Sequence, residues 1–295
     1  MTDIPAEEDP FAESRMTLGE HLDELRIRLF KGLIAVVVIF VVAYAFRDPI
    51  TKVVQAPYTG AMEKLEDFFQ AQADQKIEAG GDPYKYYLNP ADPNDRRLNG
   101  FSTRPTAIGA AEFFTVQLKI CLYVALFLGS PVLLWQLWQF IAAGLYEKER
   151  KAVRLCFPLS MSLFVAGVVF GFYLLVPYAI YFLNTGDLDL VEVQVTLDDY
   201  LVFLRSLCLA LGLIFQLPLI MSFLGWAGIV LPGTMARYRG HFALSSFIFA
   251  AILTPPDPIT QSMLAVPMVV LYEVGIWSAR FLSKRARAKE ARATA

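Results

Sequence analysis

The chain has 295 residues, of which 56% are hydrophobic and 18% are charged, and its mean hydropathy is +0.47. This composition excludes an ordinary soluble enzyme and is typical of a protein that crosses a membrane several times. The net charge of −2 gives no indication of a nucleic-acid partner.

The first fifteen residues are polar and acidic, with neither a basic region nor a small-residue cleavage site. We therefore expect residues 1–15 to form a disordered cytoplasmic tail, with no cleavable signal peptide.

The stretch Met16–Phe30 predicts an amphipathic helix that leads into the first membrane span. Thr17 and Glu20 have the spacing of a capping box, and leucines recur at helical intervals on one face. Glu24 and Arg28 are four residues apart, in the order that favours an intrahelical ion pair. The plainest interpretation is a charged lead-in that sets topology. The alternative is that Glu24 forms part of a binding site where the membrane surface begins.

Six apolar segments follow in chain order. They are Ile27–Phe46, Glu112–Ile141, Val153–Leu183, Tyr200–Ala227, His241–Leu253 and Gln261–Phe281. The fifth is too short to cross about 30 Å of hydrocarbon upright. Five prolines lie inside these spans and are expected to bend them: Pro131, Pro158, Pro177, Pro218 and Pro267. The predicted fold is an all-α polytopic membrane protein with six transmembrane helices, the last two short, bent into a concave scaffold.

The polar segments between the spans set the predicted domain boundaries. Residues 16–283 form the membrane domain, and residues 284–295 form a basic cytoplasmic tail. Residues 48–108 form a long extracytoplasmic loop, with one or two surface helices over Ile50–Phe69 and an irregular, Gly- and Pro-rich part after residue 80.

Lys and Arg are concentrated near residues 148–154 and 237–239 and in the C-terminal tail, whereas residues 184–199 and 254–260 have none. The positive-inside rule therefore predicts that both termini are cytoplasmic. Glu149 then shares a membrane face with Glu24. Two carboxylates on one face can receive guanidinium groups, although a glutamate among Lys and Arg is more often a solvated surface residue.

Other polar residues have an ordinary interpretation as well as a functional one. Gln216, in the middle of an apolar span, is more often a contact between helices than a functional group. Thr254, Asp257, Thr260 and Gln261 surround two prolines, and they predict either a capped turn, with Thr260 as the cap, or a polar depression that receives a partner helix. The three cysteines, Cys121, Cys156 and Cys208, are interpreted as buried apolar residues.

No nucleophile–base pair, metal-ligand pattern or phosphate loop is found, so we expect neither an enzyme nor a cofactor or metal. A secondary transporter or channel for a small solute remains the alternative, since Lys119, Arg205 and Gln216 could line a path. The absence of an internal repeat weighs against it.

A set of motifs resembles the TatC family, the multispanning subunit of the twin-arginine protein translocase. They are His21-Leu-x-Glu-Leu-Arg26, Ala56-Pro57, Ser130-Pro131, Trp138-x-Phe140, Leu145-Tyr146-x-x-Glu149-Arg150, Phe215-x-Leu-Pro218, Leu253-Thr-Pro-Pro-Asp257 with Ser262 and Leu264-Ala265-x-Pro267, and Leu271-Tyr-Glu273. The resemblance covers residues 16–283.

The resemblance implies a non-enzymatic receptor for the twin-arginine signal peptides of folded cargo, in a bacterial cytoplasmic membrane. The implied partners are single-span TatA- and TatB-type proteins and further copies in a larger complex, driven by the proton gradient. By position, Glu24, Arg26, Phe140 and Glu149 match the signal-peptide site. Gln216, Thr254 and Gln261 match partner-docking positions, and Pro57, Pro131, Pro218 and Asp257 match structural ones.

This chain departs from the family pattern in two places. Gln216 stands where the family often has a glutamate, so no titrating role is expected there. The outer loop, residues 48–108, is longer than expected for the family, and the resemblance does not explain residues 70–105.

Overall fold

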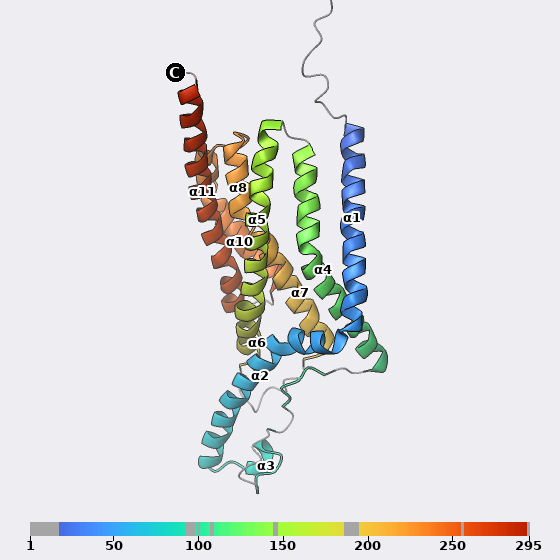
Figure 1. Ribbon diagram of the computed structural model, residues 1–295. Coiled ribbons are helices and arrows are strands. Elements are labelled where there is room, and N and C mark those ends of the chain that lie inside the picture. Colours follow the sequence, from blue (N-terminus) through green and yellow to red (C-terminus); the bar gives the residue numbers. More distant parts are fainter. Residues whose placement is uncertain are drawn as a thin grey trace, which may run out of the picture. The chain divides into compact units, whose positions relative to one another are not determined.

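The computed structural model describes residues 18–91, 98, 101–106, 109–143, 147–185, 195–254 and 257–293, and these residues are mostly helical (Figure 1). The helices are α1 (Leu18–Ala45), α2 (Arg47–Glu78), α3 (Pro83–Tyr86), α4 (Ala110–Ala143), α5 (Glu147–Phe170), the π-helical turn η2 (Gly171–Leu175), α6 (Val176–Asn184), α7 (Leu197–Ile214), α8 (Leu217–Trp226), α9 (Pro232–Arg237), α10 (Arg239–Leu253) and α11 (Pro258–Ala293). Among the described residues, β pairing is limited to two isolated bridges. The all-α fold class is confirmed.

Within the described residues, five segments are long and apolar enough to cross a membrane. They are Leu22–Ala45, Ala111–Ala143, Cys156–Asn184, Leu197–Trp226 and Pro258–Lys284. The short apolar helix α10, with 15 residues, corresponds to the fifth predicted span, His241–Leu253. The prediction that the last helix is also short is wrong. The helix α11 has 36 residues because it continues without a break into the basic tail.

The prolines interrupt the helices at two places. Pro177 follows the π-helical turn η2, and Pro218 is the second residue of α8, which follows a break at Phe215 and Gln216. Both breaks have the same cause, since proline has no N–H to donate to the preceding turn. Pro131, Pro158 and Pro267 lie inside helices that continue past them.

The chain forms two compact units. Unit 1 comprises residues 1–45 and 122–161, so its described part consists of α1, the end of α4 and the start of α5. Unit 2 comprises residues 46–121 and 162–295. The concave scaffold stays a prediction.

Within unit 1, α1 and α4 pack closely in antiparallel directions. A Cβ atom added to Gly32 would lie 2.8 Å from Cδ2 of Leu133, and one added to Gly129 would lie 3.0 Å from Cγ2 of Val36. Four residues forward along α1, from 32 to 36, correspond to four residues back along α4, from 133 to 129. This register can be extended toward both helix ends.

Unit 2 contains α2, which is one helix of 32 residues and extends beyond the surface helices predicted over Ile50–Phe69. It is long because one face is buried along its length, at residues Tyr58, Met62, Leu65, Phe69 and Ala73. Pro57 is buried inside this helix. The hydroxyl group of Tyr200 in α7 donates a buried hydrogen bond of 2.6 Å to the carbonyl oxygen of Val54, which fixes α2 to α7.

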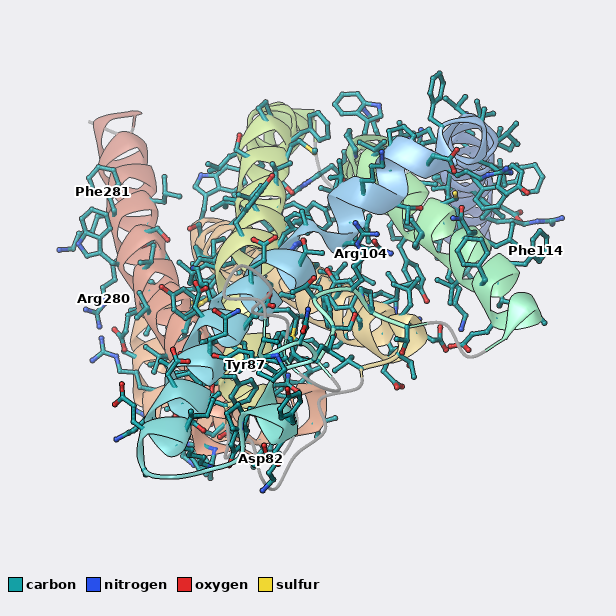
Figure 2. The ribbon with its side chains drawn as sticks, turned by 90° about the horizontal axis from the view of Figure 1, so that it is seen from below. Asp82, Tyr87, Arg104, Phe114, Arg280 and Phe281 are labelled. Atoms are coloured by element: carbon teal, nitrogen blue, oxygen red, sulfur yellow. The ribbon has the colours of Figure 1, made fainter. Side chains whose placement is uncertain are left out.

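The segment after α2 packs against that helix and against α7. Asp82 caps α3 by accepting from the backbone N–H of Tyr84 (3.0 Å), and the hydroxyl of Tyr87 donates to Asp74 (2.8 Å). Figure 2 labels Asp82 and Tyr87, which lie beside α2 and α3. Leu98 is only 2% exposed, and the N–H of Leu197 donates to the carbonyl oxygen of Thr106 (2.9 Å). The described part of this loop is therefore packed rather than open.

The helices α8 and α11 run parallel in unit 2 and meet through small residues. The hydroxyl groups of Ser222 and Ser278 are 2.6 Å apart, and a Cβ atom added to Gly225 would lie 2.9 Å from that of Ala279. The three cysteines are free; Cys121 and Cys208 are buried and Cys156 is half-buried. Their interpretation as apolar residues is confirmed for Cys121 and Cys208, whereas Cys156 is buried only in part.

Candidate functional site

The four residues predicted to bind a signal peptide all belong to unit 1. Glu24 and Arg26 lie near the start of α1, Phe140 near the end of α4, and Glu149 in the first turn of α5. These three helix ends lie at the same end of unit 1 (Figure 1). The candidate site is the group of residues at this end of the unit.

Glu24 forms an ion pair with Arg28, one turn further along α1. The contact joins Nη2 of Arg28 to Oε1 of Glu24, and the two side chains are only 26% and 21% exposed, Glu24 being the more exposed. Because Glu24 lies two residues after the start of the apolar segment Leu22–Ala45, the pair sits where that segment begins. The predicted Glu24–Arg28 pair is confirmed.

Burial along α1 identifies the face that packs on α4. Glu24 and Arg28 are half-buried and Gly32, Val36 and Ala43 are buried, at intervals of four or seven residues. The predicted leucine stripe is not this face, since Leu22 and Leu29 are 64% and 65% exposed. Glu24 and Arg28 therefore lie on the face of α1 that packs on α4, whereas Leu22 and Leu29 lie on an exposed face.

Phe140 belongs to the facing stripe of α4. Gly129, Leu133 and Phe140 are separated by four and seven residues, so they lie on one side of that helix. In the register of the α1–α4 contact, Phe140 is level with Leu25, next to Glu24. Glu24 and Phe140 therefore lie close in height on facing helices.

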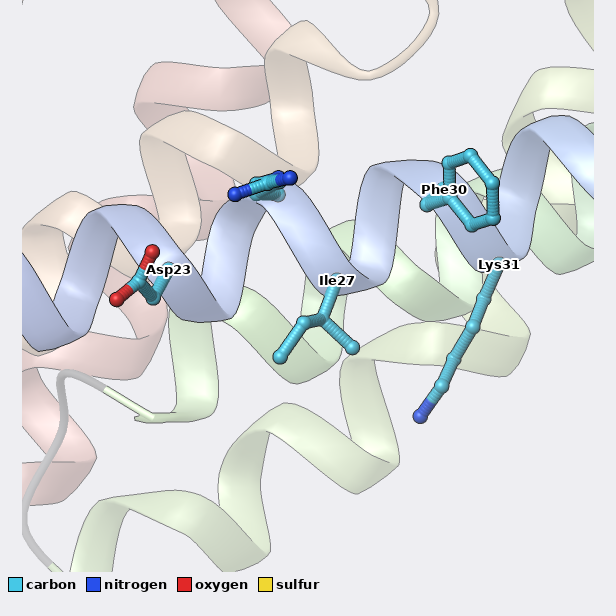
Figure 3. Close-up of a pocket in the computed structure, with 5 residues that line it drawn as sticks. Asp23, Ile27, Phe30 and Lys31 are labelled. Carbon is cyan, nitrogen blue, oxygen red and sulfur yellow. The ribbon is translucent and has the colours of Figure 1, made fainter.

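Arg26 lies on the other side of α1, because residues two apart in a helix differ by about 200°. It lines an open hollow together with Asp23, Ile27, Phe30 and Lys31. Asp23, Ile27 and Lys31 project from the same side of α1 (Figure 3). The structure does not bring Arg26 together with Glu24 at the α1–α4 contact.

Glu149 is the third residue of α5. Its side chain lies outside the described part of the structure, so its role stays a prediction. Its backbone position favours an acid, because the positive end of the helix dipole stabilises negative charge in the first turn.

Two polar atoms at this end of unit 1 were missed by the sequence analysis. Nε of Arg28 and Oε1 of Gln136 are buried and have no hydrogen-bond partner among the residues that the structure describes. Gln136 stands three residues after Leu133 and four before Phe140, and so belongs to the same stripe of α4. A glutamine in an apolar segment at this spacing is the signal that could have identified it.

The residues predicted to dock partner helices lie in unit 2. Gln216 is 7% exposed at the break between α7 and α8, and Thr254 is 5% exposed and donates to the carbonyl oxygen of Ala250 (2.9 Å). Gln261 is half-buried, and its Nε2 donates to the carbonyl oxygen of Phe247 (2.9 Å), joining α11 to α10.

The prediction that Thr260 caps the last helix is wrong. Asp257 is the cap, since its Oδ2 accepts from the N–H of Thr260 (2.7 Å) and Pro258 is the first helical residue. This hydrogen bond to the carboxylate lowers the pKa of Asp257 from its usual value.

Lys119, one of the residues that could have lined a solute path, forms an ion pair of 2.6 Å with Asp198. Both side chains are about one-third exposed and lie near the start of α4 and of α7. The charge of Lys119 is thus compensated within unit 2.

The helices and the charged end of unit 1 define a polytopic α-helical membrane protein with a polar surface where its first apolar segment begins. The family model described as Sec-independent protein translocase protein (TatC) matches residues 20–267. The chain belongs to this family, and is accordingly a multipass protein of the bacterial inner membrane.

Relatives with this name cover most of the chain. A TatC protein of Halothiobacillus neapolitanus is 35% identical over 92% of this chain, which spans 65% of that protein's length. The TatC protein of Escherichia coli K12 is 31% identical over 94% of this chain and 93% of its own. A crystal structure described as the twin arginine translocase receptor TatC has a TM-score of 0.67 and 26% identity, covering 90% of this chain and all of that one.

Proposed function

We propose that this protein is the translocase subunit that receives twin-arginine signal peptides of folded proteins at the cytoplasmic membrane surface. The observation that carries the proposal is the half-buried carboxylate of Glu24, held by an arginine of the same chain where the apolar segment begins. A site that already holds one guanidinium group is chemically suited to another.

Glu149 supplies the second carboxylate in this proposal, and Phe140 supplies an apolar contact beside the first. Both helix ends that carry these residues belong to the unit that carries Glu24. Two carboxylates would match two consecutive arginines, whereas two lysines would lose the planar, bidentate contacts. In this proposal Arg26 contributes to signal-peptide binding from the other side of α1, which lines the open hollow, and not beside Glu24.

The proposal places both termini in the cytoplasm, as the distribution of Lys and Arg favours. Its partners are TatA- and TatB-type single-span proteins and further copies of this chain, and the proton gradient drives transport. Gln261, half-buried at the contact of α10 and α11, is the most accessible of the residues assigned to partner docking.

The test is binding of a twin-arginine signal peptide, and of its twin-lysine version, to the purified protein in detergent. We expect the twin-lysine peptide to bind at least about tenfold more weakly, since each lost bidentate pair removes a charge-assisted hydrogen bond. Equal affinity for the two peptides would contradict the receptor function.

Substitutions locate the site in the same assay. Glu24→Ala and Glu149→Ala should each weaken binding of the twin-arginine peptide. Asp23→Ala and Glu147→Ala are matched controls that remove a neighbouring acid and should leave binding unchanged. If the controls weaken binding as much as the site variants do, general surface charge and not a defined site holds the peptide.

The second function considered, a transporter or channel for a small solute, is not favoured, because family membership assigns the chain to a protein translocase. The pairing of Lys119 with Asp198 also leaves less free charge for a solute path.

A further inference from the structure

We propose that Arg28 pairs with Glu24 until a signal-peptide arginine binds Glu24 in its place. Gln136 then accepts a hydrogen bond from the displaced Arg28. The inference rests on the proposed function and adds two residues, Arg28 and Gln136, that position Glu24 and set its specificity.

The first observation is that the Glu24–Arg28 pair is incomplete. Nη2 of Arg28 contacts Oε1 of Glu24, but Nε of the same guanidinium group is buried and has no hydrogen-bond partner in the described part of the chain. A guanidinium group binds a carboxylate most strongly through two parallel N–H groups, and an unpaired buried N–H is costly. An arginine from outside that can approach with both N–H groups therefore has an advantage over Arg28.

The second observation is a matching acceptor at the same height. Oε1 of Gln136 is also buried, and no described residue forms a hydrogen bond with it. Arg28 is four residues before Gly32, so in the register of the α1–α4 contact it is level with Leu137, the neighbour of Gln136. Gln136 shares the stripe of Gly129 and Leu133, which faces α1. The unpaired donor Nε of Arg28 and the unpaired acceptor Oε1 of Gln136 thus lie at the same height in the α1–α4 contact.

The exchange follows from these two features. A signal-peptide arginine takes the carboxylate of Glu24, the guanidinium group of Arg28 leaves it, and Nε–H of Arg28 donates to Oε1 of Gln136. The number of hydrogen bonds is conserved on the receptor side. A lysine cannot form the bidentate contact and displaces Arg28 less well, so Arg28 raises the selectivity for arginine.

A double-mutant cycle with the full-length protein tests this exchange. Gln136→Leu should weaken twin-arginine binding about threefold to tenfold, the usual range for one lost hydrogen bond. In the Arg28→Gln background the same substitution should have no effect, because no displaced arginine needs an acceptor. Arg28→Gln alone should lower the ratio of twin-arginine to twin-lysine affinity. Gln136→Met, unbranched and without the amide, repeats the test with less change in shape.

The matched control is Gln117→Leu. Gln117 also has a buried Oε1 without a partner, on the same helix but outside unit 1, and its replacement should leave peptide binding unchanged. Equal losses for Gln136→Leu with and without Arg28, or an equal loss for Gln117→Leu, would overturn the exchange. If the unaltered protein does not discriminate between the two peptides, the receptor function itself fails, which is a different result.

Discussion

At several positions, polar side chains inside the apolar helices form a hydrogen bond or an ion pair with another helix. Ser222 pairs with Ser278, Lys119 with Asp198, and Tyr200 with the backbone of Val54. Among the described residues, four buried side-chain atoms have no hydrogen-bond partner: Nε of Arg28, Oε1 of Gln117, Oε1 of Gln136 and Oγ1 of Thr260. Buried polar atoms are normally paired, so such exceptions mark positions where strain or function is worth testing.

Tyr200→Phe tests the clearest of the buried hydrogen bonds. The variant removes a bond of 2.6 Å and leaves the carbonyl oxygen of Val54 buried, so we expect a loss of about 1–2 kcal/mol in the free energy of unfolding. Thermal unfolding in detergent measures this loss. Tyr173→Phe is the control, because Tyr173 is 71% exposed and should tolerate the change. Equal midpoints for the unaltered protein and Tyr200→Phe would show that the bond does not stabilise the α2–α7 contact.

Asp257 gives a pH dependence with a defined sign. Its pKa is lowered in the fold, so the charged carboxylate stabilises the start of α11 above its ordinary pKa of 3.8, and this contribution is lost as the pH falls through the lowered value. Relative to the intrinsic exchange rate at each pH, hydrogen exchange at the amide of Thr260 should therefore speed up in acid. Asp257→Ala should speed it up at neutral pH as well, whereas Asp257→Asn keeps an acceptor and should remove only the pH dependence. The same acid response in Asp257→Asn would rule out the carboxylate as its cause.

At the scale of elements, close helix contacts depend on residues without side chains. A Cβ atom added to Gly167 in α5 would lie 2.6 Å from the carbonyl oxygen of Leu211 in α7, and a backbone atom cannot rotate away. This contact belongs to unit 2 and holds the C-terminal end of α5 against α7.

Gly167→Ala should therefore force α5 and α7 apart and lower the free energy of unfolding by about 1–3 kcal/mol. Gly60→Ala in α2 is the matched control, since its added Cβ atom would meet nothing within 4 Å. It should be neutral or slightly stabilising because alanine favours the helix. Thermal unfolding of the two variants in one detergent compares them directly, and equal destabilisation would contradict the contact.

The positions of most helices could be predicted from the sequence, because long apolar runs in a membrane protein have few alternatives. The length of α2 could not, since its buried face only becomes apparent when α6, α7 and Phe101 are in place. The continuation of α11 into the basic tail was also missed, because a change from apolar to charged residues ends a span but does not end a helix.

At the scale of the whole molecule, the outer loop and the candidate site belong to different units. The described part of residues 79–106 packs on α2 and α7, whereas Glu24, Phe140 and Glu149 belong to unit 1. Changes in this loop should therefore affect stability more than signal-peptide binding.

Leu98→Asp tests this separation. Placing a charge at a side chain that is only 2% exposed should loosen the loop from α2 and increase its cleavage in limited proteolysis. Twin-arginine peptide binding should stay within about twofold of the unaltered protein, since surface and distant changes usually matter little. A large loss of binding in a folded variant would show that the loop takes part in recognition. Leu88→Asp, at a residue that is 55% exposed, is the matched control.

The candidate site was predictable in part. Glu24 and its pairing with Arg28 follow from spacing and topology, and the match to family motifs brought in Phe140 and Glu149. The burial of Nε of Arg28 and the facing position of Gln136 depend on the register of α1 against α4, which no local pattern specifies. Arg26 shows that closeness in sequence can mislead. It is two residues from Glu24 and therefore lies on the opposite side of the helix.

The central claim is that the carboxylate of Glu24 recognises a guanidinium group. The most direct test is the ratio of dissociation constants for twin-lysine and twin-arginine peptides, measured for the unaltered protein and for Glu24→Gln. Glutamine keeps the size of the side chain and removes its charge, so the ratio should fall by about tenfold as one charge-assisted bidentate pair is lost. An unchanged ratio in Glu24→Gln would contradict the claim.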